Sequence, residues 1–302
     1  MKLNQLRDMV AIVERGSLRA AARDLVQAQS AMTRSIRTLE RELGTTLFDR
    51  ESKGMVLTPM GKLFYQRASS VVNELRRARE ELEQTSGDMQ GMVTAGLSIM
   101  PHVGMLPYAL PAFRKKFPRV KLRIIEGLYP ALEAGLRDGT VDFYLGATPQ
   151  TNPAAGLVTE VLFENTRTVM GRKNHPLSKA KSITELSDAE WATTSVDYNA
   201  AHDLNLLFAK YKMPEPKIML QAHSAMSIMV ALTSSDLLAI LPMQWNEFAL
   251  TREVLQVINI REHLPAPSIV CVRRSDLPLT PASEFFCDML RRYSAAHTAL
   301  PC

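Results

Sequence analysis

Apolar residues recur at the helical period through the N-terminal part of the chain. A first group, which predicts a helix ending at Gly16, consists of Leu3, Leu6, Val10 and Val13. Ser17 then stands where an N-cap belongs, before a short alanine-rich segment that predicts a second helix. A third group recurs at steps of four, three and four, and consists of Met32, Ile36, Leu39 and Leu43. This spacing predicts a third helix with one buried stripe.

The opposite side of the third helix carries hydroxyls and guanidinium groups rather than a mixture of charge signs. Three helices in this order, within about fifty residues, are typical of a helix-turn-helix whose last helix enters the DNA major groove. We therefore expect DNA contacts from Gln29, Ser30, Thr33, Arg34 and Arg37. The alternative is a solvated basic surface with no partner.

The segment after Gly44 predicts a β-hairpin. TTLFDRESKGMVLT alternates well enough for two short strands around a turn at Glu51 to Gly54, with Lys53 at the tip. A hairpin beside a recognition helix usually brings a basic tip to the phosphates or the minor groove. We expect Lys53 to contact DNA.

A long helix should begin at Thr58 and Pro59, because a threonine cap followed by proline in the first turn is a strong helix start. Its apolar residues step by four and three, as in a coiled-coil seam, and are Phe64, Ala68, Val71, Leu75, Ala78 and Leu82. A stripe this narrow on so long a helix predicts dimerisation. The alternative is a helix that lies on the C-terminal part of its own chain.

The rest of the chain alternates between apolar strands and helical segments. TAGLS, KLRIIEG and DFYLGA predict strands, and PYALPAFRKKF and ALEAGLRDG predict helices between them. TRTVMG, ATTSV, LLAILP and SIVCVRR continue the strands, and PASEFFCDMLRRY predicts a final helix. The pattern indicates an α/β domain with a parallel sheet.

Composition and charge refine this picture. The 302 residues are 46% hydrophobic and 22% charged, which is ordinary for globular protein. Residues 1 to 67 hold 12 Lys and Arg against 7 Asp and Glu, while the remainder is balanced at 24 of each, so a polyanion partner is expected for the N-terminal module alone. No signal peptide or membrane-spanning run is recognisable, and Cys271, Cys287 and Cys302 are expected to be free thiols. These features predict a cytoplasmic protein with no membrane partner.

Taken with these patterns, the sequence resembles the LysR-type transcriptional regulators. The resemblance is carried by SLRAAARDL, QSAMTRSIRTLERELGTTLFDR and LTPMG, and continues through FPRVKLRI, LRDGTVDFYLG and RRSDLPLTPAS. It implies a homodimer or homotetramer that binds operator DNA and a small-molecule effector. The expectation extends to the branch that controls degradation of aromatic acids or sulfonates. One departure is Ala28, where the family commonly has a serine cap, a loss of about 1 kcal/mol.

The resemblance also implies the domain plan. An all-α winged helix-turn-helix would occupy residues 1–58, and a linker and dimerisation helix residues 59–88. Residues 89–302 would form an α/β effector-binding domain of two Rossmann-like subdomains, as in periplasmic binding proteins. Subdomain I would hold about 92–161 and 266–302, and subdomain II about 162–265. The effector should bind in the cleft between these subdomains, outside the carboxyl ends of the strands.

Candidate effector residues follow the strands of both subdomains. Ser98 directly follows the first strand and precedes a helix start, so its hydroxyl and the next amides could receive an anion. The candidates are Ser98, Met100, Pro101, His102, Tyr129, Thr148, Ser195, Val196, Tyr198, His223 and Ser224, with Gly127, Leu128 and Ala147 at the same strand ends. Hydroxyls, imidazoles and apolar walls suit a small organic acid, with aromatic acids among the candidates.

The common catalytic motifs are absent from the sequence. It contains no GxGxxG, P-loop, HExxH or GxSxG pattern, and the SxxK at Ser178 to Lys181 has no partner motifs. The six histidines show no ligand spacing, so neither a metal nor a cofactor is expected. The remaining alternative to a regulator is a solute-binding sensor module whose N-terminal helices mediate protein contacts. Such helices should carry apolar anchors rather than Arg34 and Arg37.

Overall fold

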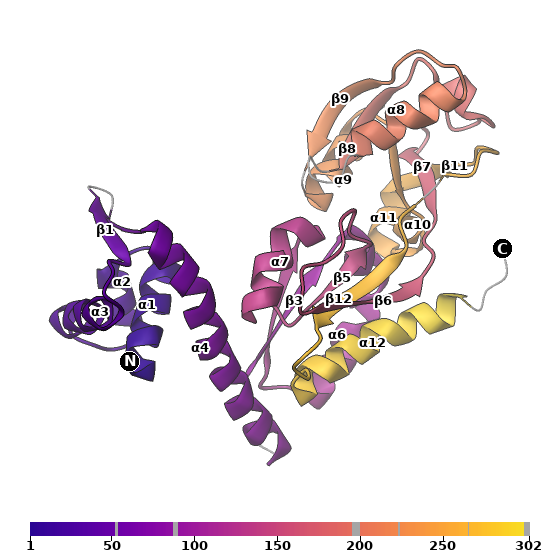
Figure 1. Cartoon of the computed structure of the whole chain (residues 1–302). Helices are drawn as coiled ribbons and strands as arrows, with labels where there is room; N and C mark the ends of the chain where they lie inside the picture. The colour runs from indigo at the N-terminus through magenta and orange to yellow at the C-terminus, as the bar shows by residue number, and fades with distance from the viewer. Residues whose placement is uncertain (52–53, 87–89, 195–199, 223, 265, 299–302) are drawn as a thin grey trace. The chain divides into compact units, whose positions relative to one another are not determined.

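The computed structural model describes residues 1–51, 54–86, 90–194, 200–222, 224–264 and 266–298 (Figure 1). Contacts divide the chain into two compact units. The first contains Met1–Gly91 together with Ala134–Val141, and the second contains Met92–Glu133 and Asp142–Cys302. No helix among the described residues has both the length and the apolar character needed to cross a membrane.

The first unit begins with the three predicted helices: α1 (Leu3–Arg15), α2 (Leu18–Asp24) and α3 (Gln29–Leu43). The predicted N-cap is confirmed, because the Ser17 hydroxyl accepts a hydrogen bond from the Ala20 amide. Gly16 and Gly44 end α1 and α3 in the left-handed conformation that glycine adopts easily. The helices enclose one core, which includes Leu6, Met9, Ile12, Ala21, Met32, Ile36 and Leu39.

The connection into α3 and the end of that helix depart from the predicted pattern. Leu43 belongs to the predicted buried stripe but is 37% exposed and is not part of the core, because it is the last residue of α3. Ala28 is the N-cap and makes no side-chain cap, as its methyl group requires. Val26, in the turn before it, has a φ of 52° and is 92% exposed. A left-handed backbone is strained for a β-branched residue.

The predicted hairpin is present as β1 (Phe48–Glu51) and β2 (Gly54–Leu57), which pair antiparallel. The Glu40 side chain on α3 accepts hydrogen bonds from the backbone amides of Leu47 and Phe48, at 2.8 and 3.2 Å. These hydrogen bonds hold α3 against the start of the hairpin. Lys53, the expected tip contact, lies outside the described residues.

The long helix is α4 (Pro59–Thr85), and Thr58 caps it by accepting a hydrogen bond from the Gly61 amide. One side of α4 is buried although it is polar, and consists of Ser69, Asn73, Arg77, Glu80 and Gln84. Asn73 donates to the Asp138 carbonyl at 2.9 Å, and Arg77 donates to the Gly139 carbonyl at 3.0 Å. Residues of the 134–141 segment, which belongs to the same unit, therefore cover this side.

The second unit contains two subdomains. The first is built on a five-stranded sheet in the order β4-β3-β5-β12-β6, with β3 (Met92–Leu97), β4 (Lys121–Glu126), β5 (Phe143–Ala147), β6 (Leu157–Phe163) and β12 (Ile269–Arg274). Its helices are α5 (Ile99–Gly104), α6 (Leu106–Lys116), α12 (Pro281–Thr298) and the first half of α7 (Tyr129–Asp138), whose residues 134–138 belong to the first unit. Figure 1 shows α12 beside α6, where Phe286 meets Phe113 edge-on. Cys271 and Cys287 are buried free thiols, with their sulfur atoms 3.7 Å apart.

The second subdomain has a three-stranded sheet in the order β10-β7-β11 and a two-stranded sheet. The strands are β7 (Arg167–Arg172), β8 (Glu190–Thr194), β9 (Lys217–Ala222), β10 (Ala239–Pro242) and β11 (Leu255–Ile258). The helices are η1 (Ile183–Leu186), α8 (Ala200–Lys210), α9 (Ala225–Ser234), α10 (Gln244–Glu247) and α11 (Ala249–Val254). The core around Trp191 and Phe208 includes Ile183, Leu186, Leu204 and Leu238.

These observations confirm the expected fold class, a winged helix-turn-helix, a long helix and a two-subdomain α/β body. The predicted parallel pairing is present for part of the sheets, between β3 and both β4 and β5, and between β8 and β9. β12 runs antiparallel to both β5 and β6, and β7 is antiparallel to β10 and β11. The reason is that the chain crosses between subdomains twice and returns in the opposite direction.

Candidate functional site

The outer side of α3 is the candidate DNA interface. Gln29, Ser30, Arg34 and Arg37 are exposed, whereas the Met32 and Ile36 side chains of the same helix are buried. Thr33 is half-buried, and its hydroxyl donates to the Gln29 carbonyl at 2.9 Å. Thr33 is thus less available than the other four, since a base contact would have to replace or share that hydrogen bond.

The predicted dimerisation stripe on α4 divides into two parts. Phe64 and Ala68 pack against the core of the N-terminal helices, and Ala68 is only 2% exposed. The remaining members are exposed in the single chain, namely Val71, Leu75, Ala78 and Leu82. Leu75 is 45% exposed and Leu82 is 73% exposed. The part of the stripe that could meet a second copy therefore begins at Val71.

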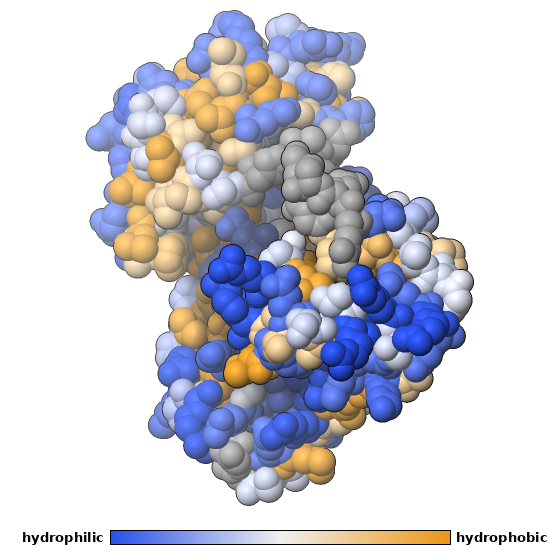
Figure 2. Space-filling model, turned by 90° about the vertical axis from the view of Figure 1, so that its left-hand side faces the viewer, coloured by the Kyte–Doolittle hydropathy of each residue, from blue (hydrophilic) through white to orange (hydrophobic). Residues whose placement is uncertain are grey.

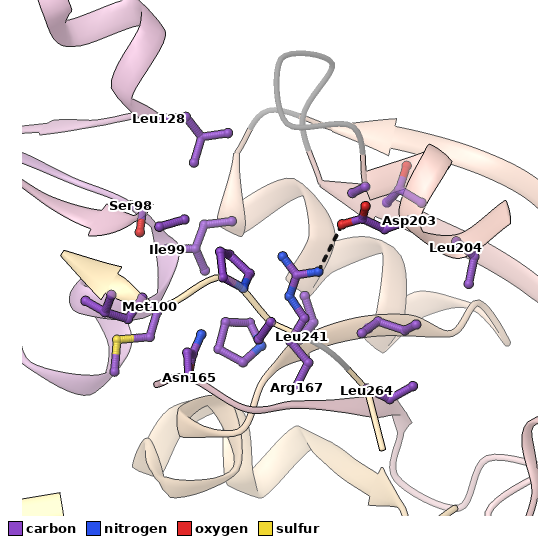
Figure 3. Close-up of a pocket in the computed structure, with 18 of the residues that line it drawn as sticks. Ser98, Ile99, Met100, Leu128, Asn165, Arg167, Asp203, Leu204, Leu241 and Leu264 are labelled. Carbon is purple, nitrogen blue, oxygen red and sulfur yellow. Dashed lines mark hydrogen bonds and ion pairs between the residues drawn. The ribbon is translucent and has the colours of Figure 1, made fainter. Parts of the chain in front are cut away.

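A cavity of about 650 Å³ lies between the two subdomains of the second unit. In Figure 3, Ser98, Ile99, Met100 and Leu128 lie on one side, and Asp203, Leu204 and Leu264 lie on the other. Asn165 and Arg167 come from the chain segment that crosses between the subdomains and starts β7. The volume is in the range of cavities that hold small organic molecules.

Charged groups border the cavity at different depths. The Arg167 guanidinium and the Asp203 carboxylate point toward one another, and their closest nitrogen and oxygen atoms are 3.5 Å apart (Figure 3). The Arg167 side chain is 16% exposed, and the Asp203 side chain is 42% exposed. Glu126 is exposed and accepts a hydrogen bond from the Ala225 amide at 3.0 Å, which joins β4 to the start of α9 in the other subdomain.

The expected effector residues reach the cavity only in part. Those that line it are Ser98, Met100, Gly127, Leu128 and Ala147. Tyr129 instead is 2% exposed and packs edge-on against Tyr144 inside subdomain I, because the helix that it begins turns this ring into the core. Pro101, His102, Thr148 and Ser224 do not line the cavity either. Thr148 donates through its amide and hydroxyl to the Ser268 carbonyl, which fixes one crossing between the subdomains. Ser195, Val196, Tyr198 and His223 lie outside the described residues.

The polar residues of the crossing segment and of α8 were not predicted from the sequence. Asn165, Arg167 and Asp203 were not among the candidates, although TRTVMG was identified as a strand. The available signal was a charged residue at the start of an otherwise apolar strand, which is unusual for a buried strand. Within the described residues, no three side chains of His, Cys, Asp and Glu come together as a metal site.

Hydrophobic residues also stand among hydrophilic ones on the surface of the second subdomain, in the upper part of Figure 2. On α8, β9 and α9 of this subdomain the residues that are more than half exposed include Leu206, Met219, Met226 and Val230. Single exposed apolar side chains are normal on soluble proteins, so they define no site by themselves.

Related proteins match much of the sequence. GltC of Bacillus subtilis, a transcriptional dual regulator, is 32% identical over 183 residues, which are 61% of this chain and 61% of that protein. The chain thus spans about three fifths of this relative. TdcA of Escherichia coli is 20% identical over 284 residues, covering 94% of this chain and 90% of its own.

Solved structures show the same fold. A full-length OxyR variant of Pseudomonas aeruginosa has a TM-score of 0.73 at 21% identity, covering 96% of this chain and 95% of its own. CbnR, a LysR family transcriptional regulator, has a TM-score of 0.69 at 21% identity, covering 97% of this chain and 99% of its own.

Family models match both parts of the sequence. Residues 3–62 match the bacterial regulatory helix-turn-helix protein model of the lysR family, and residues 86–295 match the LysR substrate binding domain. The second match alone covers more than half of the chain. The protein belongs to the LysR family of transcriptional regulators.

Proposed function

We propose that this protein binds operator DNA as a homodimer or homotetramer in the cytoplasm and adjusts transcription when a small organic acid occupies the cavity of its α/β body. The observation that carries the proposal is the division of α3. The apolar residues Met32, Ile36 and Leu39 are buried in the core. The exposed side presents Gln29, Ser30, Arg34 and Arg37. A solvent-facing helix with no partner would not need this concentration of donors.

Each of these side chains has a suitable role at DNA. An arginine in the second turn of a recognition helix can donate two hydrogen bonds to one guanine, so Arg34 is the proposed base contact. Glutamine can pair with adenine, and serine can bond to phosphates or bases. The hydrogen bonds from Leu47 and Phe48 to Glu40 keep the hairpin in register with α3, which favours simultaneous contact by both.

The oligomer is supported by the exposed stripe from Val71 to Leu82 on α4. Apolar side chains repeated along one helix face gain free energy when a second helix covers them. Pairing two modules would place two recognition helices on the two halves of an inverted repeat. In this proposal residues 1–58 form the DNA-binding domain, residues 59–88 the linker and dimerisation helix, and residues 89–302 the effector-binding domain.

The effector is proposed to be a carboxylate or sulfonate, with aromatic acids included, as in the branch that controls degradation of such compounds. Support comes from a cavity that combines Arg167 and Ser98 with largely apolar walls. A crystal structure exists of full-length CbnR in complex with its target DNA, and CbnR is 20% identical to this chain.

The proposal can be tested by gel-shift titration with a duplex enriched from a random library by the full chain. Arg34→Ala should lose about 1 to 3 kcal/mol of binding free energy at one base pair and much less when that pair is already changed. Lys53→Ala should weaken binding to every sequence alike and reduce the salt dependence. Arg252→Ala removes one exposed cation from α11 and should change neither.

Three outcomes would contradict the proposal. Equal losses for Arg34→Ala on the enriched duplex and on random duplex would remove the base contact. Failure of the unmodified chain to enrich any sequence would favour the alternative, a solute-binding sensor module whose N-terminal helices contact protein. If Arg252→Ala lost as much DNA-binding free energy as Arg34→Ala, the effect of Arg34→Ala would be explained by net charge alone.

A further inference from the structure

Cys271 and Cys287 form a pair of buried thiols that the proposed function does not use. Cys271 lies on β12 of the five-stranded sheet, and Cys287 lies on α12, which packs against the edge strand β6 of that sheet (Figure 1). The two residues are 1% and 0% exposed. Their sulfur atoms are 3.7 Å apart, and one thiol donates a hydrogen bond to the other. A single buried cysteine behaves as a small apolar residue, but two sulfurs that face one another can also share a proton or form a bond.

Only a small movement separates this pair from a disulfide. An S–S bond is about 2.05 Å long, so from 3.7 Å the sulfur atoms have to approach by about 1.6 Å. Rotation of both side chains about their Cα–Cβ bonds can share this movement. The two elements are held in place by other contacts, because β12 pairs with β5 and β6, and Phe286 on α12 packs against Phe113 and Phe143. The fold therefore keeps the two thiols within reach of one another.

The surroundings of the pair favour a thiolate on Cys271. The hydrogen bond from Cys287 lowers the pKa of Cys271, against the opposite effect of burial. The positive charge of Arg291, one turn after Cys287 on α12, also lowers this pKa. The pKa of Cys287 is raised, because its hydrogen bond with Cys271 and its burial both disfavour the charged form. The other charged groups that act on the pair are Glu160, Arg273 and Glu284. Cys271 is thus the better nucleophile, and Cys287 keeps its proton.

Burial restricts the class of oxidant that can react with these thiols. Arg291 reaches the surface, since its side chain is 21% exposed, and it bridges α12 to β6 by donating to Glu160 at 2.7 Å. The pair therefore lies close to the surface although neither sulfur is on it. Hydrogen peroxide is about the size of water and can enter through a small local opening. A disulfide such as oxidised glutathione has to bring a second sulfur to the thiolate, which requires an exposed thiol.

We propose that Cys271 and Cys287 are a modification site, a dithiol that hydrogen peroxide oxidises to a disulfide between β12 and α12. The Cys271 thiolate first attacks one oxygen of the peroxide, the O–O bond breaks, and the leaving hydroxide becomes water with the proton that Cys271 gave up. The Cys287 sulfur then attacks the sulfenic acid on Cys271, the S–O bond breaks, and the leaving hydroxide takes the Cys287 proton. Two thiols thereby lose two electrons and two protons, and one peroxide yields two waters. A thiol reductant reverses the change. The proposal is independent of DNA and effector binding.

The test uses the full chain carrying Cys302→Ser, because Cys302 lies outside the described residues and would add a third thiol. The folded protein is treated with a small excess of hydrogen peroxide, unfolded in N-ethylmaleimide and weighed by mass spectrometry. Untreated protein should carry two maleimide groups, treated protein none, and treated protein reduced with dithiothreitol two again. Oxidised glutathione should leave both thiols intact.

Three results would overturn the proposal. The first is two maleimide groups after peroxide treatment of the folded chain. The second is oxidation that is as fast in chain unfolded by guanidinium chloride as in folded chain, because unfolding separates the two sulfurs; the folded chain should react at least tenfold faster. The third is a disulfide that joins two chains on a non-reducing gel.

Single variants in the same background assign the two roles. In Cys287→Ser, which keeps a hydrogen-bond donor beside Cys271, peroxide should stop at the sulfenic acid, and dimedone should trap it. In Cys271→Ser the dimedone adduct should be at least tenfold smaller, because burial disfavours a thiolate on Cys287 alone. A larger adduct in Cys271→Ser than in Cys287→Ser would overturn Cys271 as the nucleophile. If circular dichroism shows that either variant fails to fold, the maleimide measurement on the intact pair carries the test.

Arg291 is a positioning residue for this reaction, because its charge acts on the thiols and not on the peroxide. Arg291→Gln should slow disulfide formation several-fold and raise the pH at which the rate is half-maximal, and Arg291→Lys should retain part of the rate. Arg292→Gln removes the neighbouring exposed cation of α12 and should change neither the rate nor that pH. The same half-maximal pH in Arg291→Gln as in the unmodified pair would overturn this role of Arg291.

Discussion

Helices α3 and α4 carry similar patterns and use them in opposite ways. On α3 the apolar stripe faces the core, with Met32 and Leu39 fully buried, and the polar side is exposed. On α4, from Val71 onward, the apolar stripe is exposed, and the buried residues are polar, among them Asn73 and Arg77. Hydrogen bonds to the Asp138 and Gly139 carbonyls compensate these polar groups.

Helical periodicity therefore identifies a stripe but not its partner. The α3 stripe finds its partner within about fifty residues of sequence, so a single copy satisfies it. The polar side of α4 is covered by the 134–141 segment, and this leaves the apolar side for something outside the unit. An apolar helix face that its own chain leaves exposed is expected to meet a second copy.

The largest effect should come from a charge placed in the exposed stripe. Leu75→Glu would bury an unpaired carboxylate between two α4 helices, which costs several kcal/mol unless the copies separate. Light scattering should show smaller particles and operator affinity should collapse. Gln66→Glu, which adds the same charge at an exposed position on the other side of α4, should leave both unchanged. Unchanged mass in Leu75→Glu would mean that the stripe does not pair copies.

A truncation in the α3 stripe should act within a single copy. Leu39 is fully buried, so Leu39→Ala should lower the free energy of unfolding of the N-terminal module by about 2 to 5 kcal/mol. Thermal denaturation at two protein concentrations measures this, and the loss should be the same at both. Leu75→Ala should give the reverse pattern, a loss that depends on concentration because it acts on association. If the loss of unfolding free energy in Leu39→Ala depended on protein concentration, α3 and α4 would not differ in where their stripes find a partner.

The smallest effect concerns the turn that leads into α3. Val26 combines an exposed apolar side chain with a left-handed backbone, and Val26→Gly should raise the free energy of unfolding by about 1 kcal/mol by relieving strain. Val26→Ala retains the Cβ atom and should give little of that gain. Chemical denaturation of all three proteins provides the measurement. If Val26→Gly lowered the free energy of unfolding, the Val26 side chain would make a contact that stabilises the fold by more than the backbone strain costs.

Much of the N-terminal unit could be predicted because its signals are local. Ser17, Gly44 and the Thr58–Pro59 pair mark helix ends through bonds to residues a few positions away. The stripes were found for the same reason. The exposure of Leu43 was missed because it depends on where the neighbouring helices stop, and the buried polar side of α4 because its partners lie more than sixty residues away.

The cavity was harder to predict because its walls are assembled by topology. Ser98 follows a strand, and that position predicts a cavity residue in an α/β domain. Tyr129 occupies an equivalent position after β4, yet the first turn of α7 directs its ring into the core. Arg167 and Asp203 come from a crossing segment and a helix 36 residues apart, and no local pattern shows that they meet.

The double crossing of the chain between the subdomains limits how the body can move. Two domains joined by one strand can bend, twist and swivel, but a second connection beside the first removes most of the rotational freedom and leaves bending about one axis. The β6 to β7 and β11 to β12 connections form such a pair, and Thr148 holds the second of them at the Ser268 carbonyl. Asn165 and Pro267 lie on these two connections and also line the cavity. A molecule in the cavity would therefore contact both connections, the place where any bending between the subdomains has to occur.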